Sequence, residues 1–355
     1  MMKLPWNGSM IGCVALLVAG GLADAAGQGR AAAPSFPTSR DPVFWPFSAD
    51  SPWNTPLAAT ATYSDRNAPC TVDLTDPSVS TGISALYWSQ PIYVAKPEDP
   101  WTDMGLDPTN GLPPYGLDPS IHHNNPVAEM RVPADATPAL PTYQAEPLTD
   151  AHLNIIDETH RFVVEMWRAK RIGSSKIVAF TMVKNDLRGP GLGTGGSRAY
   201  GGSALGGLIR RGELGEGIHH ALSFCIPRSK QKCCEPVWPA TTVDGKAQGT
   251  YLGHIPLGQL VALPPQVDLK SLALRPQGYA IAKALQDYGA YDVDSGGGFA
   301  IYVEPTAADE LGRAEEDLRK IRPLLRCVTN NRADSVGGGA PSALRRAPKA
   351  PPFAK

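Results

Sequence analysis

The chain has 355 residues, of which 42% are hydrophobic and 19% charged, and 33 basic and 34 acidic side chains give a net charge of −1. This length is typical of one large or two ordinary globular domains. The near-zero charge lacks the basic footprint by which proteins bind nucleic acid or anionic membranes, so we expect neither partner. The 36 glycines and 35 prolines favour a β-rich fold, because many short strands need many turns.

Residues 1–25 have the pattern of a secretory signal peptide. Lys3 supplies a positive start, residues 10–22 form a short apolar stretch, and residues 23–25 (Ala-Asp-Ala) resemble a small-x-small cleavage site. The apolar stretch is too short for a dependable membrane span, and an uncleaved anchor is the alternative. We expect a secreted or periplasmic protein that is a monomer.

Five cysteines remain after the signal, and export favours disulfides. The odd number leaves at least one thiol free or bonded between chains. Adjacent cysteines bond each other only with strain, so we expect Cys233 or Cys234 to pair with Cys225. The remaining two are Cys70 and Cys327.

A single domain over residues 44–330 is expected between two disordered ends. The leader, residues 26–43, and the tail, residues 331–355, are both rich in alanine, glycine and proline, a composition typical of disorder. Between them, short stretches rich in β-branched and aromatic residues predict strands. The expected strands cover residues 86–94, 127–133, 162–167, 177–183, 217–225, 257–263, 291–294 and 299–304.

Two helices are expected late in this domain. Apolar residues recur at helical spacing over residues 279–288, and Gly289 follows where a C-cap glycine is expected. The second helix is expected over residues 308–322. Few helices among many strands predict an all-β or β-rich fold, for which we expect a jelly-roll-like β-sandwich with one or two peripheral helices.

Residues 188–207 (RGPGLGTGGSRAYGGSALGG) are strongly enriched in glycine. Glycine permits positive φ and close backbone approach, so a phosphate-binding loop has to be considered. No Lys-Ser/Thr ending of a P-loop follows, and no strand–GxGxxG–helix unit is present. We therefore expect a loop that covers a site or lies tightly beside a sheet.

Residues 150–167 combine apolar alternation with ionisable side chains more densely than any other stretch. Side chains alternate across a strand, so Arg161, Glu165 and Trp167 share one face. A carboxylate beside an indole is typical of saccharide-binding clefts. The alternative is an ordinary amphipathic strand with Arg161 and Glu165 as a surface charge pair.

Histidines supply further candidates, because imidazole is the usual acid–base group near neutral pH and a common zinc ligand. His122 precedes an expected strand, and His152 follows Asp150. Within residues 217–225 only one of two adjacent histidines can face a site, and the apolar alternation favours His220. The alternative for each is a core histidine held by one hydrogen bond.

Three chemistries remain open from these residue types. A pair of carboxylates serves glycoside hydrolysis, whereas a histidine or tyrosine base with a cation that neutralises a uronate serves β-elimination. Arg198 is among the candidate cations. A divalent metal held by histidines and an acid is the third version, although we expect no cofactor. The sequence lacks a Gly-x-Ser-x-Gly elbow, so serine hydrolase chemistry is not expected.

A resemblance is carried by residues 203–224 (SALGGLIRRGELGEGIHHALSF), 238–245 (WPATTVDG) and 281–297 (IAKALQDYGAYDVDSGG). These segments resemble a pattern in an uncharacterised family of secreted bacterial β-rich proteins. The resemblance implies no activity. It draws attention to His220, to Asp244 and to the turn at Tyr288.

Together these features predict a secreted carbohydrate-active enzyme that cleaves a polysaccharide by acid–base catalysis, as a glycoside hydrolase or, on a uronate, a lyase. The alternative is a non-catalytic glycan-binding or cell-envelope module. Catalysis requires the ionisable groups to converge in a cleft, and scattered groups would favour the module. The expected catalytic residues are Glu165, Asp157, His220, His152 and Asp244, and the expected substrate-binding residues are Trp167, His122, Arg161 and Tyr288.

Overall fold

The computed structural model describes residues 36–107, 125–139, 150–192, 195–245 and 247–354. The predicted signal peptide, most of the predicted leader and His122 lie outside these residues. Residues 36–355 form one compact unit. No helix in the described part of the chain is long and apolar enough to cross a membrane.

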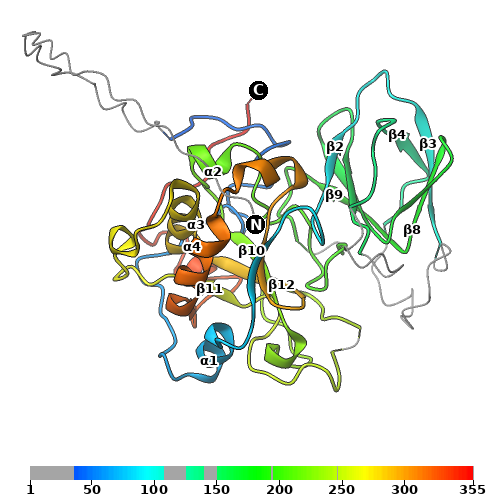
Figure 1. Ribbon diagram of the computed structural model, residues 1–355. Helices are drawn as coiled ribbons and strands as arrows, with labels where there is room; N and C mark the ends of the chain where they lie inside the picture. Colours follow the sequence, from blue (N-terminus) through cyan, green and yellow to red (C-terminus); the bar gives the residue numbers. More distant parts are fainter. Residues whose placement is uncertain (1–35, 108–124, 140–149, 193–194, 246, 355) are drawn as a thin grey trace, which may run out of the picture. The chain divides into compact units, whose positions relative to one another are not determined.

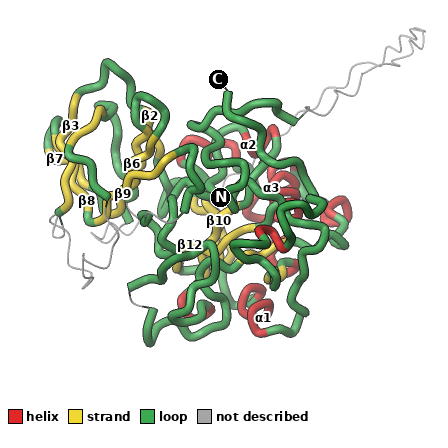
Figure 2. Tube along the Cα trace, turned by 180° about the vertical axis from the view of Figure 1, so that it is seen from behind, coloured by secondary structure: helices red, strands yellow, loops and turns green. Residues whose placement is uncertain are grey.

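The fold is β-rich and sandwich-like, with three mixed sheets and peripheral helices, in agreement with the predicted fold class (Figure 1). Long loops join the strands (Figure 2). The largest sheet has the strand order β1-β13-β10-β12-β11-β14 and mixes parallel and antiparallel pairs. Its strands are β1 (Thr81–Ser84), β10 (Leu222–Ile226), β11 (Leu260–Ala262), β12 (Ala290–Ser295), β13 (Phe299–Tyr302) and β14 (Arg326–Cys327).

The predicted strand–turn–strand unit at the end of the domain forms β12 and β13, but the two strands are not neighbours. β10 lies between them, parallel to β12 and antiparallel to β13. The glycine turn that follows β12 therefore crosses the end of β10. This crossing brings residues 296–298 next to the carboxyl end of β10, where a cavity opens.

The helices follow the sequence expectations closely. α3 (Pro276–Asp287) begins with proline in its first turn and is followed by Gly289 at φ 81°. The second predicted helix is divided into a 3₁₀ turn (Pro305–Glu310) and α4 (Ala314–Ile321). α3 and α4 pack on each other, and their apolar faces join the core formed by the largest sheet. The short helices are α1 (Pro69–Thr75) and α2 (Glu213–Glu216), with 3₁₀ turns at Arg228–Lys230, Leu269–Leu272, Arg322–Leu324 and Val336–Gly338.

The other two sheets share one buried cluster and form the sandwich-like part of the fold. Met104 and Ile177 from one sheet and Ile155 and Met166 from the other belong to the same core. The first sheet has the order β2-β5-β6-β9 and the second β4-β3-β8-β7. Their strands are β2 (Ile92–Val94), β3 (Trp101–Leu106), β4 (Glu129–Arg131), β5 (Leu153–Ile156), β6 (Phe162–Trp167), β7 (Lys170–Ile172), β8 (Lys176–Ala179) and β9 (Thr181–Asp186).

Strand β6 has the predicted bounds, whereas the strand expected over residues 177–183 is divided. Phe180 separates β8 from β9, and the two halves belong to different sheets. Both faces of β6 are covered, since its residues 163–166 are all buried. The alternative of a solvated face with an Arg161–Glu165 pair is therefore wrong.

The disulfide prediction is also wrong. Cys70 bonds Cys327, Cys233 bonds Cys234, and Cys225 is a free, buried thiol. Cys225 belongs to β10, where pairing with strands on both sides fixes its backbone. Its Sγ donates to the carbonyl oxygen of Gly298 at 3.8 Å.

The tail predicted to be disordered is ordered in residues 331–354 and packs against the beginning of the described chain. The amide of Arg40 donates to the Pro352 carbonyl at 3.0 Å, and the amide of Ala354 donates to the Arg40 carbonyl at 2.8 Å. The Arg40 guanidinium lies 3.8 Å from the centre of the Phe353 ring. These partners lie far away in the sequence, so composition alone did not reveal them.

Candidate functional site

A cavity of about 710 Å³ lies where strand ends of two sheets meet. β1, β10, β12 and β13 contribute from the largest sheet, while Trp167 at the end of β6 and Thr181 at the start of β9 contribute from the second. Trp167 and Thr181 are paired across these two strands. The glycine-rich segment at residues 195–201 and the loop at residues 242–245 complete the wall.

Close backbone packing explains the glycines around this cavity. A Cβ on Gly296 would lie 2.6 Å from the Cys225 sulfur, and a Cβ on Gly298 would collide with Ser80. Gly296 also donates its amide to the carbonyl of Ile226 at 3.1 Å. Only glycine allows this approach, so the wall here consists of backbone and small hydroxyl side chains.

Three carboxyl groups line the cavity: Asp150 before β5, Asp244 in a loop, and Asp294 near the end of β12. Asp150 and Asp294 keep 33% and 21% of their side-chain surface exposed, so both can be reached from the cavity. Burial raises the pKa of Asp294 to about 7, against the opposing charge of Arg198. Burial also raises the pKa of Asp150, opposed by a 3.0 Å hydrogen bond from Trp167 Nε1 and by Arg198.

Asp244 differs from the other two because charged and hydroxyl donors hold it. Arg228 Nη2 donates to Asp244 Oδ2 at 2.6 Å, and Ser295 Oγ donates to the same oxygen at 3.1 Å. Arg228 Nε also donates to Ser295 Oγ at 3.2 Å. This triangle fixes the Asp244 carboxyl group at the cavity wall.

Arg198 is the buried cation of the site, with 1% of its side chain exposed. Its Nη1 lies 3.6 Å from Asp294 Oδ2, and its guanidinium lies 3.6 Å from the centre of the Tyr302 ring. Burial acts to lower the pKa of Arg198, but Tyr302 and Asp294 outweigh this and raise it. The site therefore holds a permanent positive charge among its carboxyl groups.

Two of the predicted site residues that the structure describes, Asp244 and Trp167, line this cavity. His152 lies just behind it, with Nε2 3.9 Å from Asp150 Oδ2. Burial and the charge of Arg198 hold the pKa of His152 well below its usual range, so this imidazole is neutral. This neutral ring lies beside Asp150 and helps to position it, rather than exchanging protons with a substrate.

Glu165, Asp157 and Arg161 have partners elsewhere. Glu165 is fully buried and accepts hydrogen bonds from the Ser203 hydroxyl and, at 2.8 Å, from the Ala204 amide. Burial raises the pKa of Glu165 to about 7. Asp157 accepts the amides of Arg161 and Phe162 at 2.9 and 2.6 Å and so shapes the turn before β6, while Arg161 pairs with Asp186.

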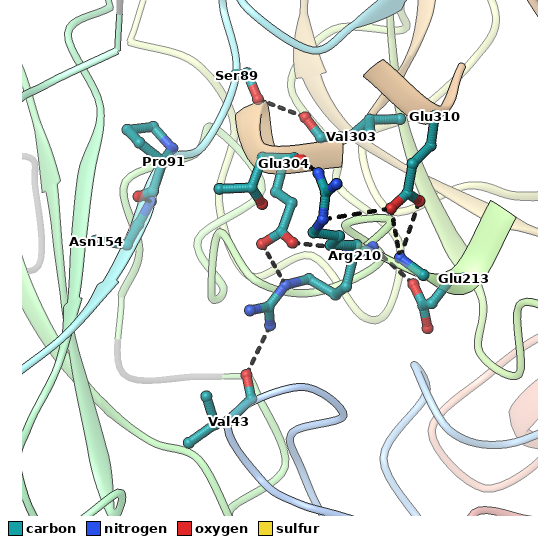
Figure 3. Close-up of polar contacts among 12 residues, drawn as sticks. Val43, Ser89, Pro91, Asn154, Arg210, Glu213, Val303, Glu304 and Glu310 are labelled. Carbon is teal, nitrogen blue, oxygen red and sulfur yellow. Dashed lines mark hydrogen bonds and ion pairs between the residues drawn. The ribbon is translucent and has the colours of Figure 1, made fainter. Parts of the chain in front are cut away.

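His220 belongs to a buried structural network rather than to the cavity wall. Its Nε2 lies 3.1 Å from Glu213 Oε2, and its Nδ1 lies 2.8 Å from the Ala221 carbonyl. Figure 3 shows the rest of this network around Arg210: its amide donates to Glu213, and its Nε donates to Glu304 at 2.7 Å. These bonds hold the loop before α2 against the segment that follows β13.

Tyr288 is buried, and its hydroxyl donates to the Pro348 carbonyl at 3.1 Å. The described members of the predicted catalytic set are therefore scattered, an outcome that favours the binding module over catalysis by these residues. The residues that do converge include Asp150 and Asp294, which were not singled out from the sequence. Asp294 could have been noticed, because it lies at the end of an expected strand just before the Ser-Gly-Gly-Gly turn.

Among the described residues, no group of three or more His, Cys, Asp or Glu side chains could hold a metal ion. Comparisons with family models, curated proteins and solved structures find no match to the chain. Function is therefore inferred from the cavity.

Proposed function

We propose that this protein is a carbohydrate-active enzyme that cleaves a polysaccharide by acid–base catalysis in the cavity. The observation that carries the proposal is the convergence of Asp150, Asp244 and Asp294 around Arg198, with Asp294 holding its proton to about pH 7. Shifted pKa values grouped in a cleft are typical of catalytic sites. A binding module needs no such group.

Asp294 serves as the general acid, because its raised pKa keeps it protonated near neutral pH. It donates this proton to the leaving glycosidic oxygen. Asp244, oriented by Arg228 and Ser295, serves as the second carboxylate, which attacks the sugar or activates a water molecule. The cation of Arg198 stabilises the Asp294 carboxylate once its proton has left.

The groups that line the cavity are of the kinds that bind sugars. Hydroxyl side chains and backbone groups offer hydrogen bonds, and the Trp167 indole provides an aromatic wall. The volume of about 710 Å³ is in the usual range of small-molecule sites. Arg198 also supports β-elimination as a second candidate, since a buried cation at the wall can neutralise the carboxylate of a uronate.

The test is to incubate the protein without residues 1–25 with neutral and uronate polysaccharides and to follow reducing ends and the absorbance of unsaturated sugars. Wild type is compared with Asp294→Asn and with Asp50→Asn, a control whose side chain is 85% exposed. Reducing ends alone, lost only in Asp294→Asn, support hydrolysis. Both signals together support elimination. Retained binding with no cleavage would overturn catalysis in favour of a glycan-binding module.

A further inference from the structure

We propose that Leu86, Tyr87 and Trp88 form a sugar-binding platform at the mouth of the cavity, which receives the part of a polysaccharide that extends beyond the cleaved bond. The inference rests on the proposed function and adds a binding subsite to it. The three side chains are 45%, 40% and 42% exposed. Trp88 is also part of the cavity wall.

Three consecutive exposed apolar side chains are unfavourable in a soluble protein unless they serve a function. The residues on either side are ordinary, since Ala85 and Ser89 are buried. The exposure is therefore confined to a short apolar segment, of which Trp88 lines the cavity. This position distinguishes it from apolar side chains that are scattered singly over a surface.

The backbone at Trp88 has φ 59°, a left-handed conformation that bulky L-residues rarely adopt. Such outliers persist only where their surroundings hold them, and they cluster at binding sites. Here the conformation places the Trp88 indole at the cavity wall. A role for the ring in the cavity accounts for this strain.

Hydrogen bonds fix this segment on both sides. Before it, the Val303 amide donates to the Ser84 carbonyl at 2.9 Å, and after it the Ser89 hydroxyl donates to the Val303 carbonyl at 2.6 Å (Figure 3). Further on, Asn154 Nδ2 donates to Gln90 Oε1 at 2.9 Å and to the Pro91 carbonyl at 3.0 Å. A platform held in this way loses little conformational freedom when a ligand binds.

The chemistry of the platform points to a carbohydrate chain. Residues 86–88 carry no charge, and aromatic rings with a polar edge suit the apolar face of a sugar ring, whose hydroxyl groups remain in water. Trp88, which is 42% exposed, and Trp167 both line the same cavity. A chain that has one unit at Asp294 would therefore leave past Trp88.

Trp101 offers a matched control. Its side chain is 53% exposed on β3, it is not among the described residues that line the cavity, and the Arg131 guanidinium lies 4.9 Å from its ring centre. Removing this indole takes away a similar exposed aromatic area. It leaves the mouth of the cavity intact.

The experiment compares wild type, Trp88→Ala, Trp88→Phe and Trp101→Ala by affinity electrophoresis through gels that contain xylan, mixed-linkage β-glucan or polygalacturonate. The polysaccharide that retards wild type is then cut into oligosaccharides of two to eight units, and Kd is measured by calorimetry. Melting temperatures establish that each variant is folded.

We expect Trp88→Ala to weaken binding of the long oligosaccharides on the order of tenfold and to leave the shortest ones unchanged. Trp88→Phe should recover part of the loss, and Trp101→Ala should behave as wild type. Equal affinities of Trp88→Ala and wild type for all lengths would overturn the platform even if cleavage is observed. Retention that depends on Trp88 without any cleavage would support the platform and overturn the catalytic proposal. No retention of wild type by any gel would overturn the platform.

Discussion

The Nη1 atom of Arg198 lies 3.6 Å from Oδ2 of Asp294. This separation exceeds the 2.7–2.9 Å typical of a charge-assisted hydrogen bond. Arg198 therefore attracts the Asp294 carboxylate without fixing it in the ionised state, and burial still raises the pKa of Asp294 to about 7. A proton donor beside a cation that compensates its later charge is well suited to general acid catalysis.

The first prediction concerns the pH dependence of cleavage. Because Asp294 must carry its proton, kcat/KM should fall as pH rises above about 7, the pKa of this group. Asp294→Asn should lower kcat by roughly 10²–10⁴-fold and remove the alkaline limb from any residual activity. A pH–rate profile measured on the polysaccharide substrate checks both. An unchanged alkaline limb in the variant would show that another group supplies the proton.

The same raised pKa predicts a cost in stability. Between pH 3.8 and about 7 the folded state keeps a proton on Asp294 that the unfolded state has lost, so stability falls as pH rises through this range. Asp294→Asn removes this cost, which is at most about 4 kcal/mol. The variant also loses the attraction between the Asp294 carboxylate and Arg198, so its net gain in stability is smaller. Its melting temperature should exceed that of wild type at pH 8 and approach it at pH 4. Asp50→Asn should follow wild type at both.

Glu165 provides a direct test between the sequence-based and the structure-based assignments. Glu165→Gln keeps one acceptor oxygen, which can bind the Ala204 amide, while its amide nitrogen can donate to the Ser203 hydroxyl oxygen. We therefore expect the variant to keep activity within about tenfold. Glu165→Ala should lower stability by about 2–4 kcal/mol, because both donors would be buried without a partner. Denaturant melts and initial rates measure these effects. Complete loss of activity in Glu165→Gln would restore Glu165 as a catalytic residue.

His220 should affect stability rather than catalysis. Burial acts to lower the pKa of His220, but the charge and hydrogen bond of Glu213 outweigh this and raise it. The pair therefore stabilises the fold fully below the unfolded pKa and ceases to do so as pH rises through the folded pKa. His220→Gln should cost about 2 kcal/mol at pH 5.5 and less at pH 9, with cleavage rates nearly unchanged. An equal cost at both pH values would contradict the ion pair.

The two disulfides should differ in their contribution to stability. Cys70–Cys327 joins residues 257 positions apart, so Cys70→Ala should cost on the order of 3–5 kcal/mol by enlarging the unfolded ensemble. Cys233–Cys234 joins neighbours and closes no loop, so its removal should cost under about 1 kcal/mol. Guanidinium melts of the Cys70→Ala variant and of a Cys233→Ala, Cys234→Ala double variant measure the difference.

Local patterns predicted the elements that depend on local physics. The alternation around Val164 located β6 at its observed bounds, and helical spacing with Gly289 located α3. Trp167 and Asp244 were also recognised as site candidates, and both line the cavity. In these cases the signal lies within a few residues of the feature that it indicates.

Features that depend on distant partners were not predicted. Asp150 and Asp294 meet only because the ends of β5 and β12 approach one cavity, and no local pattern links these strands. Glu165 has the expected position on β6, but the Ser203 hydroxyl that donates a hydrogen bond to it comes from the glycine-rich segment. The division of a predicted strand at Phe180 likewise follows from membership in two sheets.

The pairing of early with late segments determines when the native contacts can form as the chain is synthesised. β1 pairs with β13, Cys70 bonds Cys327, and Arg40 binds the segment around Phe353. A ribosome releases the early partners long before the late ones, so the native fold cannot close until residue 353 has emerged. A nascent chain that ends near residue 330 already holds all strands of the described residues, yet Arg40 still lacks its partner. The contacts of Arg40 with this segment therefore form only after residue 353 has been made.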